Sequence, residues 1–366
     1  MRKGILAVAT AGAVVLGGLA ACGKSNNSAG SSGGAGGKAP FVGVILPDSK
    51  TSARWEGNDR PYLEKAFQAA GVKYDIENAQ GDKNAFQTLA DQLITKGVNV
   101  LVIVNLDSGT GKAVLDKAKA QGIATIDYDR LTLGGGADFY VSFDNVAVGK
   151  LQGQGLVKCL TDMKAAKPKV AELNGSPTDN NATLFAQGYN SVLDPKYSDG
   201  TLVKGPNQAV PDWDNAQAGT IFEQMLTANK DIKGVLVAND GMANSVISVL
   251  KKNSLNGQVP VTGQDATVQG LQHILDGDQC VTVYKAIKKE ADATAALAVA
   301  LAKGQNPSVN SSVDDPTSKK KVKAELETPV AIYKDNVKDV VADGYVTKAD
   351  LCTGAYAAKC TAAGIS

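Results

Sequence analysis

Polar and charged side chains stand directly after successive apolar runs in this sequence. Asp accepts hydrogen bonds from neighbouring hydroxyls, Arg and Lys donate them, and Asn does both. Hydrogen bonds to charged groups contribute about 1.5–3 kcal/mol each, so several of them can outweigh the desolvation of a small uncharged polyol. The residues are Asp48 after the run 41–46, Asp129 and Arg130 after 124–128, Asn181 in the loop after 170–173, Asn239 after 235–238, Asp265 after 260–262 and Lys285 after 281–284.

Two tryptophans can add an apolar surface to this set. Trp55 stands at the start of a helical stretch, and Trp213 lies in a loop between Asp212 and Asp214. A flat indole covers the C–H face of a sugar ring, but a place in the core is the more common use of Trp. The pattern leaves both interpretations open for Trp55, whereas the flanking aspartates favour a binding role for Trp213.

Several of these polar residues also have a purely local interpretation. Asp48 can be a turn residue, and Asp240 can cap a helix while Asn239 faces a ligand. Asp144 and Asn145 are interpreted as helix caps. Each position alone is a weak signal, and it is their joint occurrence at successive strand ends that indicates one site.

These side chains need a scaffold that brings the ends of the runs together. Apolar runs alternate with helical stretches, and glycines such as Gly97 stand where predicted helices end. The predicted strands are 41–46, 72–76, 98–104, 124–128, 139–143, 170–173, 235–238, 260–262 and 281–284. The predicted helices include 54–70, 84–96, 113–121, 145–160, 216–227 and 243–252, and 308–321 is predicted as a surface loop leading into a strand.

Strand–helix alternation predicts parallel sheets covered by helices. A sheet of more than about ten strands is uncommon. The chain of 366 residues is therefore predicted to be an α/β protein with two doubly wound parallel-sheet lobes. In such open sheets, ligands bind beyond the carboxyl ends of the strands. The polar residues after the predicted strands are thus expected to share one site.

The composition and motifs argue against several other functions. With 38 basic and 37 acidic residues and no long charge block, nucleic acid is not expected as a partner. The segment 108–112 resembles a phosphate loop but lacks its first glycine, and Ala113 replaces the magnesium-binding hydroxyl. His273 is the only histidine and no closely paired cysteine motif is present, so we expect no metal, no cofactor and no His-based catalysis.

The N-terminus has the order of a secretory signal. Arg2 and Lys3 precede an apolar segment, 4–19, which is too short to span a bilayer comfortably. The next residues, Leu-Ala-Ala-Cys at 19–22, look like a bacterial lipobox, in which the chain is cut before the cysteine and a diacylglycerol is attached to the sulfur. The alternative is a plain cleavage site with an incidental Cys22.

From the lipobox we expect a lipoprotein signal peptide over 1–22 with Cys22 as the lipidation site. The Gly-, Ser- and Asn-rich stretch that follows has nothing to bury, so 23–40 is expected to be a flexible tether. Together these features predict an exported protein held by lipid at the outer face of the cell membrane.

Four further cysteines remain, an even number that suggests disulfides in an exported chain. Cys352 and Cys360 are close in sequence, so their pairing is the simplest prediction. Cys159 and Cys280 would then close a long loop, and free buried thiols remain the alternative for this pair.

The sequence resembles the bacterial D-xylose-binding proteins of the type I periplasmic-binding-protein family, from about 41 to 345. The segments that carry the resemblance are Ser-Ala-Arg-Trp at 52–55, Asp-Tyr-Asp-Arg at 127–130, Tyr-Val-Ser-Phe-Asp-Asn at 140–145, Gly-Ser-Pro-Thr-Asp-Asn-Asn-Ala at 175–182, Ala-Asn-Asp at 238–240, Gly-Gln-Asp-Ala at 263–266 and Thr-Val-Tyr-Lys at 282–285.

The resemblance implies the type I fold, in which two lobes joined by three chain crossings close on one sugar. The implied lobes are 41–143 plus 286–328 and 144–285 plus 329–366. The implied ligands are Arg54, Asp129 and Arg130 from the first lobe, Asn181, Asn239, Asp265 and Lys285 from the second lobe and the hinge, and Trp55 and Trp213 as a sandwich around the ring, with Asp48 as a weaker candidate.

The chain also departs from that pattern. Ala286 follows Lys285 where a proline is expected, and the tail beyond Tyr345 has no recognised match. Close relatives bind glucose, galactose or ribose, so these sugars are the alternatives to D-xylose.

We therefore expect a monomeric binding lipoprotein, not an enzyme, that captures a monosaccharide, D-xylose foremost, for the membrane permease and ATPase of an ABC importer. The alternatives are another sugar, a sensory role, and a sugar-processing enzyme that uses paired carboxylates. A gene regulator of similar lobe design is disfavoured by the export signal and the missing DNA-binding headpiece.

Overall fold

A computed structural model describes residues 39–365 of the chain. The predicted signal peptide, the lipidation site Cys22 and nearly all of the predicted tether lie outside the described residues. Within 39–365, no helix has both the length and the apolar character that a membrane crossing requires.

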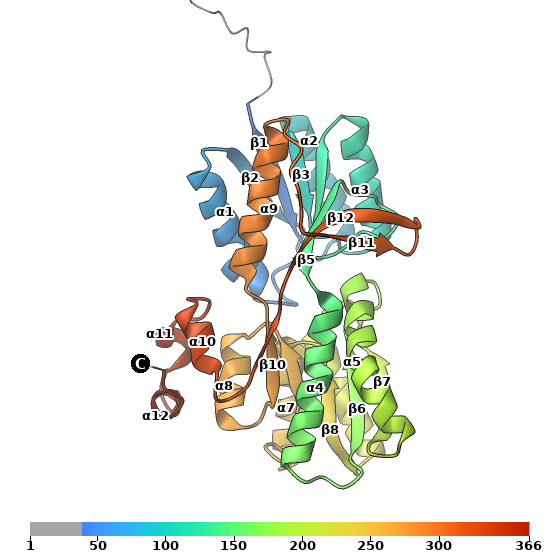
Figure 1. The fold of residues 1–366 in the computed structure, drawn as a ribbon, viewed down its shortest axis with the longest axis vertical. Helices are drawn as coiled ribbons and strands as arrows, with labels where there is room; N and C mark the ends of the chain where they lie inside the picture. Colours follow the sequence, from blue (N-terminus) through green and yellow to red (C-terminus); the bar gives the residue numbers. More distant parts are fainter. Residues whose placement is uncertain (1–38, 366) are drawn as a thin grey trace, which may run out of the picture. The chain divides into compact units, whose positions relative to one another are not determined.

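The first lobe is built on one sheet of seven strands (Figure 1). All neighbouring strands are parallel except the hairpin pair β11 and β12. The central strands are buried along their whole length, as runs of Val, Ile and Leu covered on both faces should be. In spatial order the strands are β11 (Ser311–Asp315), β12 (Lys320–Glu327), β5 (Phe139–Phe143), β4 (Ala124–Tyr128), β3 (Val100–Ile103), β1 (Phe41–Leu46) and β2 (Lys73–Asn78).

Helices cover both faces of this sheet. Phe67 and Ala295 belong to a core on one face, formed with α1 and α9, and Phe86 and Leu115 belong to a second core, formed with α2 and α3. The helices are α1 (Arg60–Ala69), α2 (Lys83–Lys96), α3 (Ser108–Ala120) and α9 (Ile287–Ala302).

The predicted helix 54–70 is divided in the structure. Its first part is a π-helical turn, η1 (Trp55–Asp59), and the regular helix α1 begins at Arg60. Pro61 explains the break, because proline has no N–H to donate to the carbonyl four residues earlier. The π turn places Arg54, Trp55 and Asp59 on buried positions at the edge of the lobe.

The second lobe contains two three-stranded sheets that a single parallel bridge, Val235 to Val261, connects. The strands are β7 (Val203–Ala209), β6 (Lys169–Asn174) and β8 (Ile232–Val237) in one sheet, and β13 (Val330–Ile332), β10 (Val281–Tyr284) and β9 (Thr262–Gln264) in the other. The lobe's helical segments are α4 (Asn145–Asp162), α5 (Asn180–Ser198), η2 (Pro211–Trp213), α6 (Asn215–Ala228), α7 (Asp240–Lys252) and α8 (Val268–Asp276).

Three strands were absent from the sequence prediction, and the predicted loop 308–321 was wrong in part. It holds β11 and the first residues of β12, which form an antiparallel hairpin. Strand β11 is an edge strand with few apolar residues, so it lacks the pattern of a buried strand. The same is true of β7, an edge strand that is exposed or half-buried along its length. Strand β13 has only three residues.

The chain passes between the two sets of sheets three times. It crosses at Asp144 between β5 and α4, at Lys285 and Ala286 between β10 and α9, and at 328–329 between β12 and β13. Figure 1 shows these crossings beside one another between the lobes. This is the α/β fold of two sheet-containing lobes that the sequence predicted.

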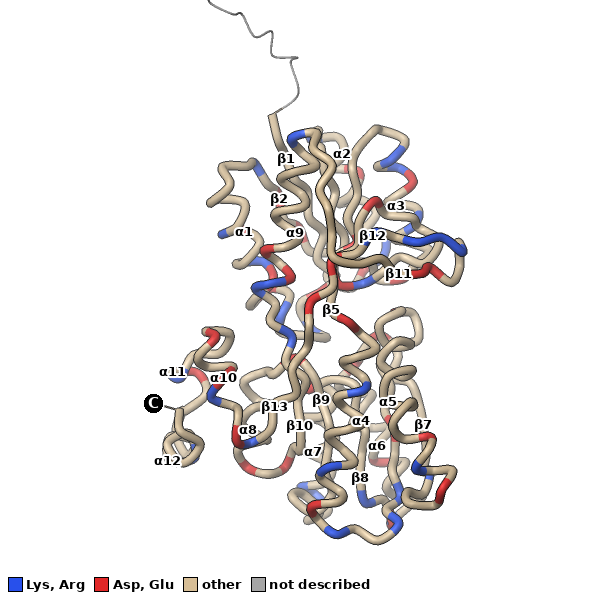
Figure 2. The backbone as a smooth tube through the Cα atoms, viewed as in Figure 1, with Lys and Arg blue, Asp and Glu red and all other residues tan. Residues whose placement is uncertain are grey.

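The C-terminal segment forms three short helices against α8. They are α10 (Val337–Ala342), α11 (Lys348–Leu351) and α12 (Tyr356–Ala362). Gln272 of α8 donates a hydrogen bond to the carbonyl of Leu351 at 3.2 Å. Lys and Arg are interspersed with Asp and Glu over both lobes (Figure 2).

Candidate ligand-binding site

One cavity collects nearly all of the predicted site residues. It lies beyond the carboxyl ends of the strands of both lobes, where ligands of open α/β sheets bind. Every predicted site residue except Asp48 lines it. The lining residues are Thr51, Ser52, Arg54, Trp55, Asp129, Arg130, Asp179, Asn181, Phe185, Trp213, Asn239, Gln264, Asp265 and Lys285.

Asp48 lies outside this cavity, so its prediction as a weaker site candidate needs correction. Its carboxylate accepts hydrogen bonds from the backbone N–H of Lys50 and of Thr51, each at 2.7 Å, and from the Thr51 hydroxyl at 2.6 Å. The side chain therefore closes a turn after β1, which is the local interpretation that the sequence had also allowed.

Arg54 is the centre of a buried ion network in the first lobe. Its guanidinium donates to both carboxylate oxygens of Asp59, at 2.9 and 2.6 Å, and to Asp129 Oδ2 at 2.6 Å. A further bond of 2.6 Å reaches Glu290 Oε2 on α9, and the Tyr128 hydroxyl donates to Asp59 Oδ1 at 2.5 Å. Because three carboxylates hold it, the Arg54 guanidinium is fixed before any ligand arrives.

The carboxylates of this network differ in the direction of their pKa shifts. Burial raises the pKa of Glu290 well above its usual value and also raises that of Asp59, although Arg54 opposes both shifts. Burial alone would raise the pKa of Asp129 too, but the cations Arg54, Lys285 and Arg130 hold it below its usual value. Asp129 is thus the carboxylate kept charged at the cavity wall.

Asp179 of the second lobe pairs with Arg130 of the first. Arg130 Nε lies 3.0 Å from Asp179 Oδ2, and the Trp213 indole N–H donates to the same oxygen at 3.1 Å. Burial raises the pKa of Asp179, while Arg130 lowers it. The pair connects the lobes directly across the cavity.

Asn181 makes a second direct connection between the lobes. Its Nδ2 donates to the Asp129 carbonyl at 2.9 Å and to Asp129 Oδ1 at 3.2 Å. Its Oδ1 accepts from Asn145 Nδ2 at 2.9 Å. The amide is therefore oriented by residues at the start of α4 and by the loop after β4.

Lys285 stands on the second chain crossing, between two carboxylates. Its ammonium lies 3.1 Å from Asp265 Oδ1 and 4.0 Å from Asp129 Oδ2. Lys285 is only 4% exposed, so this charge is satisfied by protein partners.

The suggestion that Asp240 caps the helix is wrong, because the N-cap of α7 is Asn239 and Asp240 lies inside the helix. Asn239 caps α7 by accepting from the Met242 N–H at 2.9 Å while it also lines the cavity. Asp240 points into the lobe and accepts from Gln279, Thr282 and Thr267.

Both tryptophans are buried and both line the cavity, so for these residues the core and site interpretations apply together. The guanidinium carbons of Arg54 and Arg130 lie 4.4 and 5.5 Å from the Trp55 ring centre. The Trp213 ring meets Phe185 edge to face, 6.4 Å between ring centres. A Cβ at position 175 would collide with the Trp213 ring, which explains the glycine there.

Several backbones at the cavity adopt the left-handed region. Asp129 has φ 61°, Trp213 56° and Asp265 94°. Such conformations cost about 1–3 kcal/mol each in a non-glycine residue and persist only where the surroundings impose them. Their concentration at these strand ends is typical of a functional site.

The space enclosed by these side chains is small. The cavity measures about 30 Å³, which at about 10–15 Å³ for each water is room for about two water molecules. A larger guest therefore requires the lobes to separate and the pairs Arg130–Asp179 and Asn181–Asp129 to exchange partners.

Sequence reasoning missed several polar residues that line the cavity or hold its wall. Asp179 lies in the quoted segment 175–182, where its place before a helix could have marked it. Gln264 directly precedes Asp265. Asp59 and Glu290 lie inside helical elements, and no local pattern distinguishes them from surface residues.

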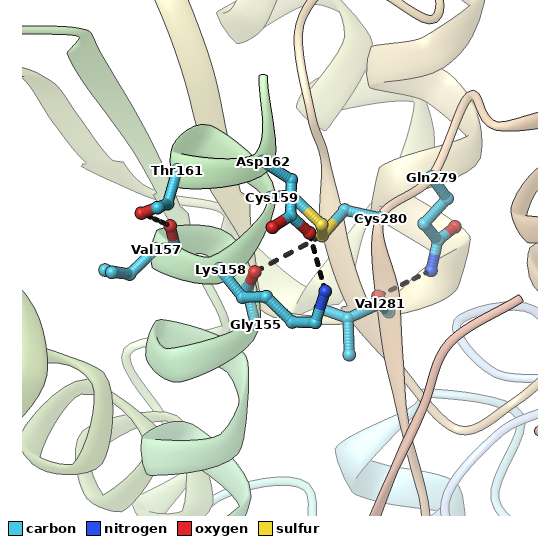
Figure 3. The surroundings of a disulfide bond; sticks show 9 residues. All are labelled: Gly155, Val157, Lys158, Cys159, Thr161, Asp162, Gln279, Cys280 and Val281. Carbon is cyan, nitrogen blue, oxygen red and sulfur yellow. Dashed lines mark hydrogen bonds and ion pairs between the residues drawn. A yellow bond between two sulfur atoms is a disulfide. The ribbon is translucent and has the colours of Figure 1, made fainter. Parts of the chain in front are cut away.

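Both predicted disulfides are present. Cys352 pairs with Cys360, and Cys159 on α4 pairs with Cys280 directly before β10, so the alternative of free thiols does not apply. Figure 3 shows the Cys159–Cys280 bond beside Gly155, with Val281 at the start of β10 and Gln279 shortly before it. All four cysteines lie outside the first lobe's sheet and its helices.

One group of potential metal ligands exists among residues 39–365, formed by His273, Asp276 and Asp278 at the end of α8. Lysines already pair with both carboxylates: Lys359 with Asp276, and Lys251 with Asp278 at 2.9 Å. Burial lowers the pKa of His273. The arrangement is that of a salt-bridged helix end.

The two-lobed α/β fold with a polar cavity between the lobes defines a solute-binding protein. Residues 42–306 match the family model described as "Periplasmic binding protein domain". The chain is 36% identical over 311 residues to a D-xylose-binding periplasmic protein of Haemophilus influenzae, which covers 84% of this chain and 90% of the relative. A D-xylose-binding periplasmic protein of Escherichia coli is 34% identical, with 85% and 92% covered.

Solved structures give the same result. A carbohydrate-transporter solute-binding protein from Chloroflexus aurantiacus, in complex with D-glucose, matches with a TM-score of 0.77 and 30% identity over 84% of this chain and 97% of that protein. A solute-binding protein from Clostridium phytofermentans with bound β-D-glucose has a TM-score of 0.78 and 28% identity over 85% and 99%. The chain belongs to the type I periplasmic-binding-protein family, whose matched members are binding proteins and not enzymes.

Proposed function

We propose that this protein binds a monosaccharide, D-xylose foremost, between its two lobes and delivers it to the permease of an ABC importer. One observation carries the proposal. Carboxylates, amides, cations and two indoles, brought from both lobes, line a single cavity. These groups match the alternating hydroxyls and apolar C–H faces of a pyranose. D-xylose is placed first because two relatives with that printed specificity are 36% and 34% identical.

The proposed ligands are Arg54, Trp55, Asp129, Arg130, Asn181, Trp213, Asn239, Asp265 and Lys285, to which the geometry adds Asp179. In the binding step, sugar hydroxyls replace the contacts that now connect the lobes. Asp129 and Asp179 accept from hydroxyls, Arg130 and Lys285 donate to hydroxyl oxygens, and the indoles cover the ring. Because the sugar touches both lobes only when they are closed, it shifts the equilibrium toward the closed form.

The lobes that would move as units are 41–143 with 286–328 and 144–285 with 329–366. The lipobox at Cys22 supports a protein anchored at the outer face of the cell membrane, where a permease receives the sugar. No oligomer is required, since both walls of the cavity come from one chain.

Isothermal titration calorimetry of the secreted chain with D-xylose, D-glucose, D-galactose and D-ribose tests this function. We expect one site, micromolar affinity for at least one sugar, which is about −8 kcal/mol, and the tightest binding for D-xylose. Arg130→Ala should abolish most of the binding. Arg60→Ala is the matched control, because Arg60 pairs with Glu56 on the surface, outside both lobes' cavity walls. Absence of heat with every sugar would overturn the proposal.

A further inference from the structure

A second, larger cavity opens directly beside the proposed sugar cavity. It measures about 460 Å³, within the range of about 300–1,000 Å³ that small-molecule sites occupy. The two cavities share the wall residues Thr51, Ser52, Arg54, Asn239 and Asp265. The two cavities therefore adjoin one another along these side chains.

Five uncharged amides line the second cavity, beside the charged side chains of Lys50, Arg54, Asp265 and Asp350. Asn58 comes from η1 in the first lobe, Asn215 and Asn244 come from α6 and α7, and Gln269 comes from α8. Amides both donate and accept hydrogen bonds, so they suit a neutral polyol better than an ion.

Two of these amides have hydrogen-bonding capacity that the protein does not use. The side-chain oxygens of Asn215 and Asn244 are buried and accept no hydrogen bond from any group in residues 39–365. An unsatisfied buried acceptor costs about 1–3 kcal/mol, which a ligand hydroxyl would recover when the amide turns toward it.

The C-terminal segment supplies an apolar wall. Tyr345 and Val346 line the cavity, and the Tyr345 ring packs against Tyr284 with 5.1 Å between ring centres. The hydrogen bond from Gln272 to the Leu351 carbonyl holds the same segment on α8. A fixed aromatic ring can cover the C–H face of a second sugar.

Two glycines line the cavity. Gly57 lines it from η1, and a Cβ there would meet nothing within 4 Å. At Gly241, a Cβ would lie 2.7 Å from Asn215 Oδ1 and displace that amide. A side chain at position 57 would thus enter free space, whereas one at position 241 would disturb the wall.

We propose that this second cavity binds the second pyranose of a disaccharide whose first ring occupies the cavity between Trp55 and Trp213. The inference rests on the proposed function and extends it from free monosaccharides to disaccharides. The amides of Asn215 and Asn244 bind the second ring's hydroxyls, and Tyr345 covers one of its faces.

Calorimetry of the secreted chain with D-xylose, D-glucose, xylobiose and cellobiose tests the inference. We expect at least one disaccharide to bind as tightly as its monosaccharide. Gly57→Phe fills the second cavity and should weaken disaccharide binding at least about tenfold, while changing monosaccharide binding less than about twofold. Asn244→Leu should act in the same direction. Ser248→Leu, one turn further along α7 on an exposed position, is the matched control.

The outcomes separate the two proposals. Monosaccharide binding without any disaccharide binding overturns the second cavity and leaves the proposed function standing. Disaccharide binding that neither Gly57→Phe nor Asn244→Leu weakens also overturns it. If neither monosaccharides nor disaccharides bind, both the proposed function and the role proposed for the second cavity are overturned.

Discussion

The two lobes hold their site residues by different means. In the first lobe, Arg54 is held by ion pairs with Asp59, Asp129 and Glu290, all of which are buried. In the second lobe, Asp179 and Asn239 are helix N-caps and are oriented by backbone N–H groups. An ion network fails when one charge is removed, whereas a cap loses a single hydrogen bond.

The lobes also differ in covalent support. The first lobe has one continuous sheet of seven strands, and the second has two sheets of three strands linked by one bridge. Both disulfides lie with the second set of sheets and the C-terminal segment. The first lobe's broad sheet thus has no crosslink, whereas in the second lobe one disulfide joins α4 to the start of β10.

The largest effect is expected from Arg54→Met. The change leaves three buried carboxylates without their common cation, which costs about 3–5 kcal/mol of the free energy of unfolding, and it should abolish measurable sugar binding. Urea unfolding and calorimetry measure the two effects. Arg54→Lys keeps the positive charge but loses the several N–H donors of the guanidinium. Compared with Arg54→Met, it should therefore recover part of the stability and little of the sugar binding. Unchanged stability in Arg54→Met would refute the ion-network account.

The disulfides should contribute unequally. Cys159 and Cys280 are 121 residues apart, and Cys352 and Cys360 are 8 apart. Loop-closure entropy then gives about 5 kcal/mol for the long loop and about 2.5 kcal/mol for the short one. Urea unfolding of the two double Cys→Ser variants measures the difference. Equal losses would show that the long disulfide does not support the second lobe in this way.

One pH effect should be shared by the lobes. Burial raises the pKa of Asp127 and of Asp240 to about 7. Because each folded pKa exceeds the unfolded value of about 3.9, each group adds stability that is fully present below that value and is lost as pH rises through about 7. Between pH 5 and pH 8 the loss is about 2–3 kcal/mol for each group.

Urea unfolding at these two pH values tests this effect. Asp127→Asn in the first lobe and Asp240→Asn in the second should each remove part of the slope. A wild-type chain that is equally stable at both pH values would contradict the shifts.

The smallest effect is expected from Asn239→Ala. Loss of the cap on α7 should lower the free energy of unfolding by about 1 kcal/mol, and loss of one amide should weaken sugar binding by about tenfold. Asn239→Ser keeps a capping oxygen and should restore the stability alone. If Asn239→Ala lowered the free energy of unfolding as much as Arg54→Met, the proposed difference between an ion network in the first lobe and helix caps in the second would be contradicted.

The sequence was sufficient for the fold class, and the structure brings the predicted strand-end residues, except Asp48, to one cavity. Buried strands can be recognised from their apolar runs. The residue after each run lies at the carboxyl end of the strand, where ligands bind, as Asp129 and Asn239 do. The edge strands β7 and β11 carry no such pattern, because nearly all of their residues are exposed or half-buried. The helical residues Asp59 and Glu290 could not be predicted, since only the tertiary fold brings them to Arg54.

Asp48 shows the opposite limit. It follows a strand as the other candidates do, yet its carboxylate accepts hydrogen bonds from the backbone N–H groups of Lys50 and Thr51. The difference between a ligand and a turn residue lies in the backbone conformation after the strand, which residue type alone does not specify.

A crystal structure of the secreted chain grown with D-xylose is the most direct test of the central claim. We expect one pyranose between Trp55 and Trp213, with hydroxyls within hydrogen-bond distance of Asp129 and Arg130 on one side and Asn239 and Asp265 on the other. Density for the sugar at any other place, or lobes closed at saturating D-xylose with no sugar between them, would contradict the account.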